Sequence, residues 1–547
     1  MSERTYTTWK CNGLGLLVLA VIAAAVVWPL AQWFADLTGA LRLAELWTDD
    51  VLQQAFRNSV GVLLLGSALA SLIALPVAFV ALRCSPAVRW SVAALALIAF
   101  AMPAFLVAAV LQDLASLAAG VVPASWLMGL EPFGAFATLV LTYAVHYSPL
   151  IALTTLMGLL QIDASLEESA RNLGAGRLKV WWQITRPLAM PGYLAGATLA
   201  ALRMLEDAAT PLVLGVREML APQLLLALGR EAGGANAASP FAIALLLVAA
   251  LLVAGAWSSL SSRDLAAGDD TRVRARRWPR APARVVAVLA LPAFALVALP
   301  VLGWLLHLAS GALIDRTGDP STALADALFA QWPVLHDSLP YIGLSAGLAV
   351  LLGASAAAAR GHGPVARALR GATVALWTIP GLVLAAAYLV NSDRLDALGV
   401  AIPFGSTGLL AAVVALKLLP LLERLFAGRS VLDLDTGRPV AVLGLGLRAT
   451  LPLLVAAFAF AAVGALAEIS AMLVLVHTPP LPFTQTVYMA LQGDAPALDW
   501  AVPGVLLTLI IVGLIATAVV LVRARRRLHS GVEQPFRLPA EWQRGSA

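Results

Sequence analysis

Six ionisable side chains lie inside long apolar stretches of this 547-residue sequence. They are His146, Arg203, Glu206, Asp207, Lys417 and Glu468. Charged groups at membrane depth are costly, so they usually face a protein interior or a water-filled path. Two interpretations follow. Either the three carboxylates form a cation-attracting constriction on a translocation path that His146 and Lys417 also line, or they pair with the three basic groups to fix helix packing.

The elements that hold these groups are predicted to be membrane-spanning helices. Apolar side chains make up 61% of the sequence and charged ones only 12%, which is too little polar surface for a soluble globule of this size. Apolar runs of roughly 20 residues, the length that crosses a bilayer, recur about twelve times. The sequence therefore predicts an all-α membrane protein. The expected spans are Leu14–Trp33, Asn58–Leu82, Ser91–Leu111, Phe133–Leu156, Tyr193–Val213, Pro240–Ser259, Val285–Leu308, Ser338–Ala359, Thr373–Val390, Gly405–Leu425, Leu451–Val476 and Ala501–Val522.

These helices are predicted to form two parallel six-helix repeats. The matching anchors are Pro103 with Pro380, Leu65–Ala70 with Leu344–Ala349, and Pro149 with Pro420. His146 and Lys417 then occupy equivalent positions, each three residues before the aligned proline. Asp207 likewise corresponds to Glu468. A pseudo-two-fold axis along the membrane normal, with a path between the halves, is the arrangement that such a duplication favours.

A charged segment separates the repeats. Residues 261–284 hold many arginines and aspartates with two prolines, and charge of this density neither crosses a bilayer nor forms a core. We expect a first repeat at 1–260, a basic linker at 261–284, a second repeat at 285–525 and a tail at 526–547.

The basic residues indicate the orientation. Most of the 36 Lys and Arg residues fall on the side that holds both termini, so this side is predicted to be cytoplasmic. The same rule accounts for the net charge of +5 without a nucleic-acid partner; the basic clusters are expected to meet anionic lipid. Cys11 and Cys84 have no neighbours of metal-ligand type, so no metal site is expected.

The connection at 161–191, after the fourth predicted helix, is longer than a simple turn requires. Its stripe of Leu166, Ala170, Leu173 and Leu178, with charged residues elsewhere around it and a break at Gly174, predicts a pair of short amphipathic helices. Such a pair suits contact with a partner protein. The alternative is an amphipathic segment that rests on lipid headgroups.

The residues of this segment follow a recognisable order. Glu168-Ser-Ala-Arg-Asn-Leu-Gly174 is followed by Ile184 and Arg186-Pro187. This resembles the EAA loop of type I ABC importer permeases, on which a cytoplasmic ATPase docks. The resemblance implies that Glu168, Ala170 and Gly174 make the coupling contact. Ile184 and Pro187 would then return the chain to the membrane, although Arg186 stands where the family pattern has Leu.

The second repeat holds a partial copy of this loop at 428–452. Aligning Leu451-Pro452 with Arg186-Pro187 puts Asp433 opposite Glu168, whereas aligning Gly444 with Gly174 puts Arg438 there. Under either alignment the second loop departs from the family pattern. We therefore expect asymmetric coupling, with Asp433, Gly444 and Pro452 as its residues.

Motifs for other functions are lacking in the sequence. None of Lys10, Lys179 and Lys417 follows Gly or precedes Ser or Thr, so the chain has no phosphate-binding P-loop, and no enzyme motif was found. A twelve-helix facilitator is the rival interpretation. Its usual signature in the loop between the second and third helices is missing from the short segment Arg83–Arg89.

The resemblance implies a fused permease subunit in a bacterial inner membrane. It looks closest to the ferric-iron branch, through Leu205–Gly215 and Glu468–Leu475, with thiamine and 2-aminoethylphosphonate permeases as near relatives. The expected partners are a homodimeric ATPase, which would hold ATP and magnesium, and a periplasmic or lipid-anchored substrate-binding protein. No cofactor is expected in this chain.

Overall fold

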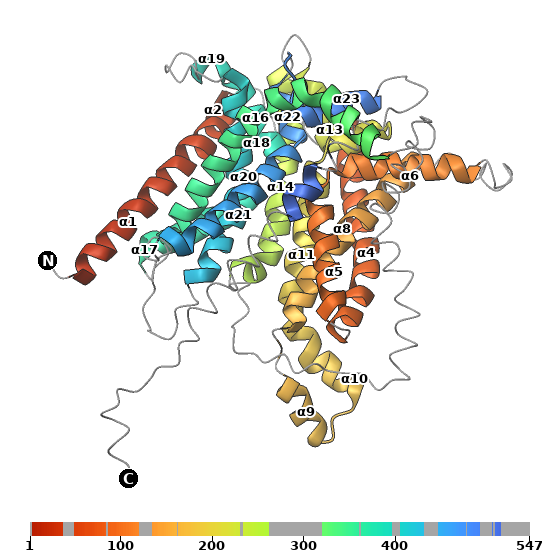
Figure 1. Cartoon of the computed structure of the whole chain (residues 1–547), viewed down its shortest axis with the longest axis vertical. Coiled ribbons are helices and arrows are strands. Elements are labelled where there is room, and N and C mark those ends of the chain that lie inside the picture. Colours follow the sequence, from red (N-terminus) through yellow and green to blue (C-terminus); the bar gives the residue numbers. More distant parts are fainter. Residues whose placement is uncertain are drawn as a thin grey trace.

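The fold is described from a computed structural model, in which the described residues form helices joined by turns and breaks, without a strand (Figure 1). The structure describes residues 3–36, 49–83, 86–119, 134–160, 162, 164–229, 234–261, 320–359, 363–395, 405–430, 447–476, 479–492, 506 and 509–515. Several expectations lie outside these residues. They concern nearly all of the linker, the span Val285–Leu308, most of Ala501–Val522, the tail at 526–547, and both Asp433 and Gly444.

The first half contains long helices joined by short ones. Its long helices are α4 (Asp50–Arg83), α8 (Gly134–Leu160), α11 (Arg186–Glu206) and α14 (Gly234–Ser261), preceded by the run α1 (Glu3–Ile22), η1 (Ala23–Val27) and α2 (Trp28–Asp36). The shorter elements are α5 (Pro86–Ala101), α6 (Ala104–Ala119), α9 (Ala164–Asn172), α10 (Arg177–Val180), η3 (Trp181–Thr185), α12 (Ala209–Val213) and α13 (Leu220–Leu228).

The second half presents a similar order of elements. Its long helices are α16 (Pro320–Ala358), α20 (Gly405–Ser430) and α21 (Leu447–Leu466). The shorter ones are α17 (Pro364–Ala375), η4 (Leu376–Thr378), α18 (Gly381–Val390), α19 (Ser392–Leu395), α22 (Ser470–Leu475) and α23 (Phe483–Gln492). In both halves a long helix packs on the one that carries the aligned interior proline, α4 on α8 and α16 on α20.

The described residues contain six helices that are long and apolar enough to cross a membrane. A seventh span is counted if α17–η4 and α18, which meet at an angle of 88°, are taken as one bent crossing. This establishes an all-α, multi-pass membrane protein. The expected total of twelve stays a prediction.

Four of the expected continuous spans are broken. The one predicted at Thr373–Val390 is interrupted between Thr378 and Gly381, at the 88° bend. The helix predicted at Ser91–Leu111 ends at Ala101 and restarts at Ala104, because Pro103 lacks a backbone donor and disfavours helical geometry at the residue before it. The helices predicted at Tyr193–Val213 and Leu451–Val476 end at Glu206 and Leu466. In both, an acidic side chain after the break bonds to the backbone of the next short helix.

Glycines allow the central helices of the first half to pack closely. A Cβ at Gly192 of α11 would lie 2.5 Å from the carbonyl oxygen of Thr154 on α8, and one at Gly196 would lie 3.1 Å from Cα of Ile151. Small residues at these crossings bring backbones together without the help of a hydrophobic driving force, which a bilayer does not supply. This packing fixes α8 and α11 relative to each other. It therefore also fixes the positions of His146 on α8 and of Arg203 and Glu206 on α11.

Candidate translocation cavity and docking loop

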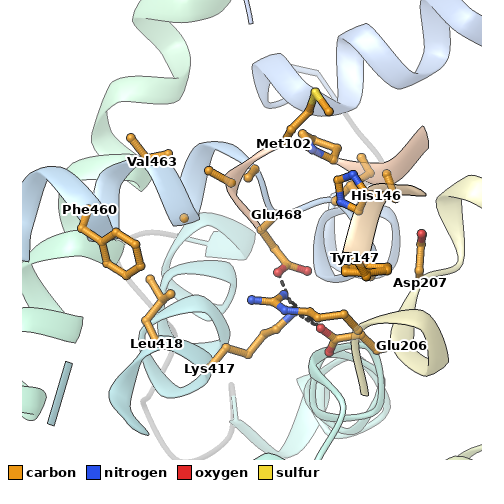
Figure 2. Close-up of a pocket in the computed structure, with 18 residues that line it drawn as sticks. Met102, His146, Tyr147, Glu206, Asp207, Lys417, Leu418, Phe460, Val463 and Glu468 are labelled. Carbon is orange, nitrogen blue, oxygen red and sulfur yellow. Dashed lines mark hydrogen bonds and ion pairs between the residues drawn. The ribbon is translucent and has the colours of Figure 1, made fainter. Parts of the chain in front are cut away.

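A cavity of about 70 Å³ lies where the broken helices of the two halves meet (Figure 2). The break at Met102 and Pro103, α8 and α11 supply one side, and α20, α21 and the break after Leu466 supply the other. The volume has room for a few water molecules. All six intramembrane ionisable residues lie on its wall: His146, Arg203, Glu206, Asp207, Lys417 and Glu468.

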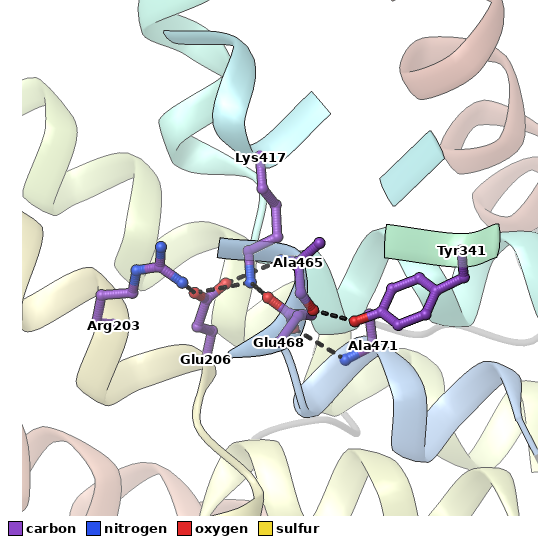
Figure 3. A network of polar contacts seen from close by, with 8 residues as sticks. Arg203, Glu206, Tyr341, Lys417, Ala465, Glu468 and Ala471 are labelled. Carbon is purple, nitrogen blue, oxygen red and sulfur yellow. Dashed lines mark hydrogen bonds and ion pairs between the residues drawn. The ribbon is translucent and has the colours of Figure 1, made fainter. Parts of the chain in front are cut away.

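Four of these charges form one connected network (Figure 3). Lys417 Nζ lies 3.1 Å from Glu206 Oε1 and 2.6 Å from Glu468 Oε2. Glu206 Oε1 also accepts a hydrogen bond of 3.0 Å from Arg203, and Oε2 accepts one of 3.0 Å from the backbone N–H of Gly381. The network therefore joins residues of both halves through one lysine and one carboxylate.

Asp207 and Glu468 have the same local role in the two halves. Asp207 Oδ1 accepts the backbone N–H of Thr210, three residues on, at 3.1 Å, and Glu468 Oε1 accepts that of Ala471 at 3.2 Å. Each carboxylate thereby satisfies a donor at the start of a short helix that has no intrahelical partner. This is why the chain breaks there despite its apolar sequence.

The two carboxylates differ in their other partners. Asp207 Oδ2 accepts hydrogen bonds from the hydroxyls of Tyr143 and Thr210, whereas Glu468 pairs with Lys417. Figure 2 shows Asp207 apart from the Lys417 cluster. The first half thus satisfies its carboxylate with neutral donors and the second half with a cation.

His146 departs from the ion-pair interpretation. The residue is 2% exposed, its ring lies edge-on to Tyr147 at 4.6 Å, and its Nδ1 atom has no hydrogen-bond partner within the described residues. Lys417, its predicted equivalent in the second repeat, contacts two carboxylates. The packing interpretation therefore describes Arg203, Lys417, Glu206 and Glu468. It does not account for His146, whose Nδ1 finds no partner among the residues that the structure describes.

The predicted docking loop projects from one end of the helix bundle as α9 and α10 (Figure 1). Glu168 is exposed, Ala170 is half-buried, and the pair of short helices is broken near Gly174 as expected. Ile184 is half-buried in η3, and Pro187 is exposed in the first turn of α11. The chain enters the bundle as one helical run from Arg177 to Glu206.

Gly174 has a specific conformational task. Its φ of +85° is in the left-handed region that favours glycine. Its N–H bonds to the carbonyl of Arg171 at 2.9 Å, and the N–H of Ala175 bonds to that of Ala170 at 3.0 Å. These are the two bonds of a Schellman motif, which ends α9 and satisfies its last carbonyls.

Sequence reasoning missed Glu167 beside Glu168. Glu167 is 6% exposed and accepts a hydrogen bond of 2.7 Å from the hydroxyl of Thr185, 18 residues further on. Arg171 lies 4.0 Å from its other oxygen. Glu167 therefore fastens α9 to η3, and Glu168 beside it is left free for other contacts. The apolar stripe is not covered, since Leu173 is 89% and Leu178 is 70% exposed.

The second loop is shorter than predicted at both ends. α20 continues to Ser430 and α21 begins at Leu447, so Pro452 lies within a helix. The loop was placed at 428–452 by alignment with the loop of the first repeat. The helix propensity of the neighbouring Leu and Ala residues extends both helices into these bounds.

The segment that carries the predicted docking loop and half of the cavity matches a known family. Residues 66–267 match the model of the binding-protein-dependent transport system inner membrane component. Over these residues, which are less than half of the chain, the sequence is similar to that family. The matched segment includes His146, Glu206 and Asp207 as well as the loop at 161–191.

Named relatives agree with this family. Part of the chain is 33% identical to the molybdenum transport system permease protein ModB of Escherichia coli K12 over 132 residues, which are 23% of the chain and 58% of the relative. A probable molybdenum ABC transporter permease protein of Haloferax volcanii is 29% identical over 243 residues, 44% of the chain and 87% of the relative. The chain thus spans somewhat over half the length of the first relative. No solved structure matches it.

Proposed function

We propose that the chain is the membrane subunit of a binding-protein-dependent ABC importer, with its two halves forming one translocation path. The observation that carries this proposal is the projecting loop within the family match, with its exposed leucines and its exposed Glu168. An uncovered apolar stripe outside the bilayer suits a partner protein. The cytoplasmic position of both termini and of the loop is part of the proposal.

The substrate is proposed to be a molybdenum oxyanion such as molybdate. This revises the expectation of ferric iron, thiamine or 2-aminoethylphosphonate, because the relatives named above are molybdenum permeases. The residue likeness at Leu205–Gly215 lies in the helix break after Glu206, so it reports on local backbone structure rather than on a substrate.

The proposed cycle assigns a task to each partner. A substrate-binding protein delivers the ligand at the end of the molecule opposite α9, and a dimeric ATPase, which carries ATP and magnesium, binds the docking loop. Nucleotide binding would bias a two-state arrangement of the two halves around the cavity. Asp433, Gly444 and Pro452 would supply the weaker second contact.

The decisive experiment measures ATP hydrolysis by the complete complex in lipid vesicles. With the binding protein present, molybdate is expected to stimulate ATPase activity, whereas ferric iron, thiamine and 2-aminoethylphosphonate should leave it at the basal rate. Stimulation by one of these others would keep the permease role and replace the substrate. Solute movement down a proton gradient without any ATPase would instead favour a facilitator.

Unequal docking sites predict unequal effects of charge reversal. Glu168→Lys is expected to lower molybdate uptake more strongly than Asp433→Lys, because the first loop matches the motif at more positions than the second. Uptake by vesicles with each variant, at matched permease content, gives the comparison. Equal losses would contradict the asymmetry.

A further inference from the structure

We propose that Arg203, Lys417 and the backbone N–H of Gly381 form an oxyanion-binding site, which the carboxylate of Glu206 fills in this structure. The transported oxyanion would take the place of that carboxylate when the halves rearrange. The inference rests on the proposed function and adds to it the residues that contact the substrate.

The geometry around Glu206 is that of a bound anion. One oxygen accepts from Arg203 at 3.0 Å and lies 3.1 Å from Lys417 Nζ, and the other accepts from the Gly381 N–H at 3.0 Å. Two cations and the first N–H of the ten-residue helix α18 therefore converge on one carboxylate. Charged donors and helix N-termini are the groups that bind phosphate-like anions in proteins.

The site depends on the absence of a side chain at Gly381. A Cβ there would lie 2.4 Å from Cδ and 2.9 Å from Nζ of Lys417. The stem of the lysine passes over the glycine, and this brings the ammonium group and the backbone N–H to the same anion. Any other residue at this position would displace the lysine.

The network can be divided between the two halves without leaving an unpaired charge. Arg203 and Glu206 belong to the first half, and Lys417 and Glu468 to the second; each pair is bonded within its half. The contacts of Glu206 with Lys417 and with Gly381 cross between the halves. If the halves separate, Lys417 keeps Glu468 as its partner. Lys417 and the backbone N–H of Gly381 then no longer bond to Glu206, and each can donate a hydrogen bond to another acceptor.

The cavity holds one more group that suits an anion. His146 Nδ1 is buried on the same wall and has no partner within the described residues. A neutral imidazole can donate one hydrogen bond from a ring nitrogen, so it offers a further contact without adding charge. The first half thus supplies Arg203 and His146, and the second supplies Lys417 and Gly381.

The test compares two neutral isosteres of neighbouring carboxylates. The full-length chain in lipid nanodiscs is incubated with radiolabelled molybdate, without nucleotide, and the equilibrium dissociation constant is measured. Glu206→Gln is expected to bind molybdate at least about tenfold more tightly than the unmodified chain, since one charged contact is worth that much. Lys417→Gln in the Glu206→Gln background should abolish the gain.

Asp207→Asn is the matched control. It removes the same charge from the same cavity, but Asp207 contacts Tyr143 and Thr210 rather than the three donors. An equal gain in both variants would show a general charge effect and overturn the proposal, as would no gain in either. If Glu206→Gln does not fold, Glu206→Asp withdraws the carboxylate at constant charge, and its failure to bind more tightly would overturn the proposal.

The failure of this proposal and the failure of the importer assignment are distinguished by two separate measurements. Molybdate-stimulated ATPase of the unmodified complex tests the proposed function. A complex that is stimulated, with a Glu206→Gln chain that gains no affinity, keeps the function and removes only the site. Sulfate in place of molybdate shows whether the donors select between oxyanions.

Discussion

Lys417→Met is expected to destabilise the chain by about 3 to 5 kcal/mol, the usual cost of removing one partner from a buried ion pair. The ammonium group lies between Glu206 and Glu468, and both carboxylates are buried. Methionine matches the length of the stem but leaves Glu468 without a cation. Thermal unfolding in detergent, followed by tryptophan fluorescence, should show a clearly lowered midpoint.

A second substitution tests the cause of that loss. Glu468→Gln in the Lys417→Met background removes the carboxylate that has lost its partner, so most of the stability should return. Glu206 retains Arg203 in this double variant. If the double variant were no more stable than Lys417→Met alone, lost packing rather than unpaired charge would be responsible.

Leu173→Asp is expected to weaken ATPase binding about tenfold to a hundredfold while leaving the fold intact. The side chain is almost fully exposed on the projecting loop, and burying a leucine in an interface is worth about 1.5 to 3 kcal/mol. An aspartate there also has to be desolvated on docking. Binding of the purified ATPase to the chain in nanodiscs gives the dissociation constant directly.

Leu226→Asp provides the control for that measurement. Leu226 is 44% exposed on α13, which lies at the opposite end of the molecule from α9 (Figure 1). This variant should bind the ATPase as the unmodified chain does. Equal weakening by both substitutions would mean that the loop is not the docking surface.

Hydropathy predicted the helical class and most of the long helices because lipid forces backbone groups to bond within a segment. It could not predict the breaks after Glu206 and Leu466. Those breaks depend on Asp207 and Glu468 bonding to backbone N–H groups three residues on, a local interaction that a window average does not register. At Met102 the proline was visible, but prolines also stand inside α8 and α20 without breaking them.

The six cavity residues were found by charge alone, and their role in transport stays a prediction. Pairing of Arg203 and Lys417 with the carboxylates was among the two interpretations. The uncharged partners were not found, because Gly381 acts through its backbone and Tyr143 and Thr210 carry no charge. Glu167 was overlooked for a related reason. Adjacent glutamates are equivalent in a sequence, and only the fold turns one toward Thr185 and the other toward solvent.

The continuity of the chain from Arg177 to Glu206 has a mechanical consequence. These 30 residues form one helical run, which at 1.5 Å per residue is about 45 Å long. Near its N-terminal end, Thr185 donates a hydrogen bond to Glu167 of α9. At its C-terminal end, the carboxylate of Glu206 accepts a hydrogen bond from Gly381 of the other half. If the proposed ATPase tilts the end of this run near Arg177, the whole run would tilt with it and would move Glu206. The same helix would then take part both in ATPase contact and in the rearrangement of the cavity.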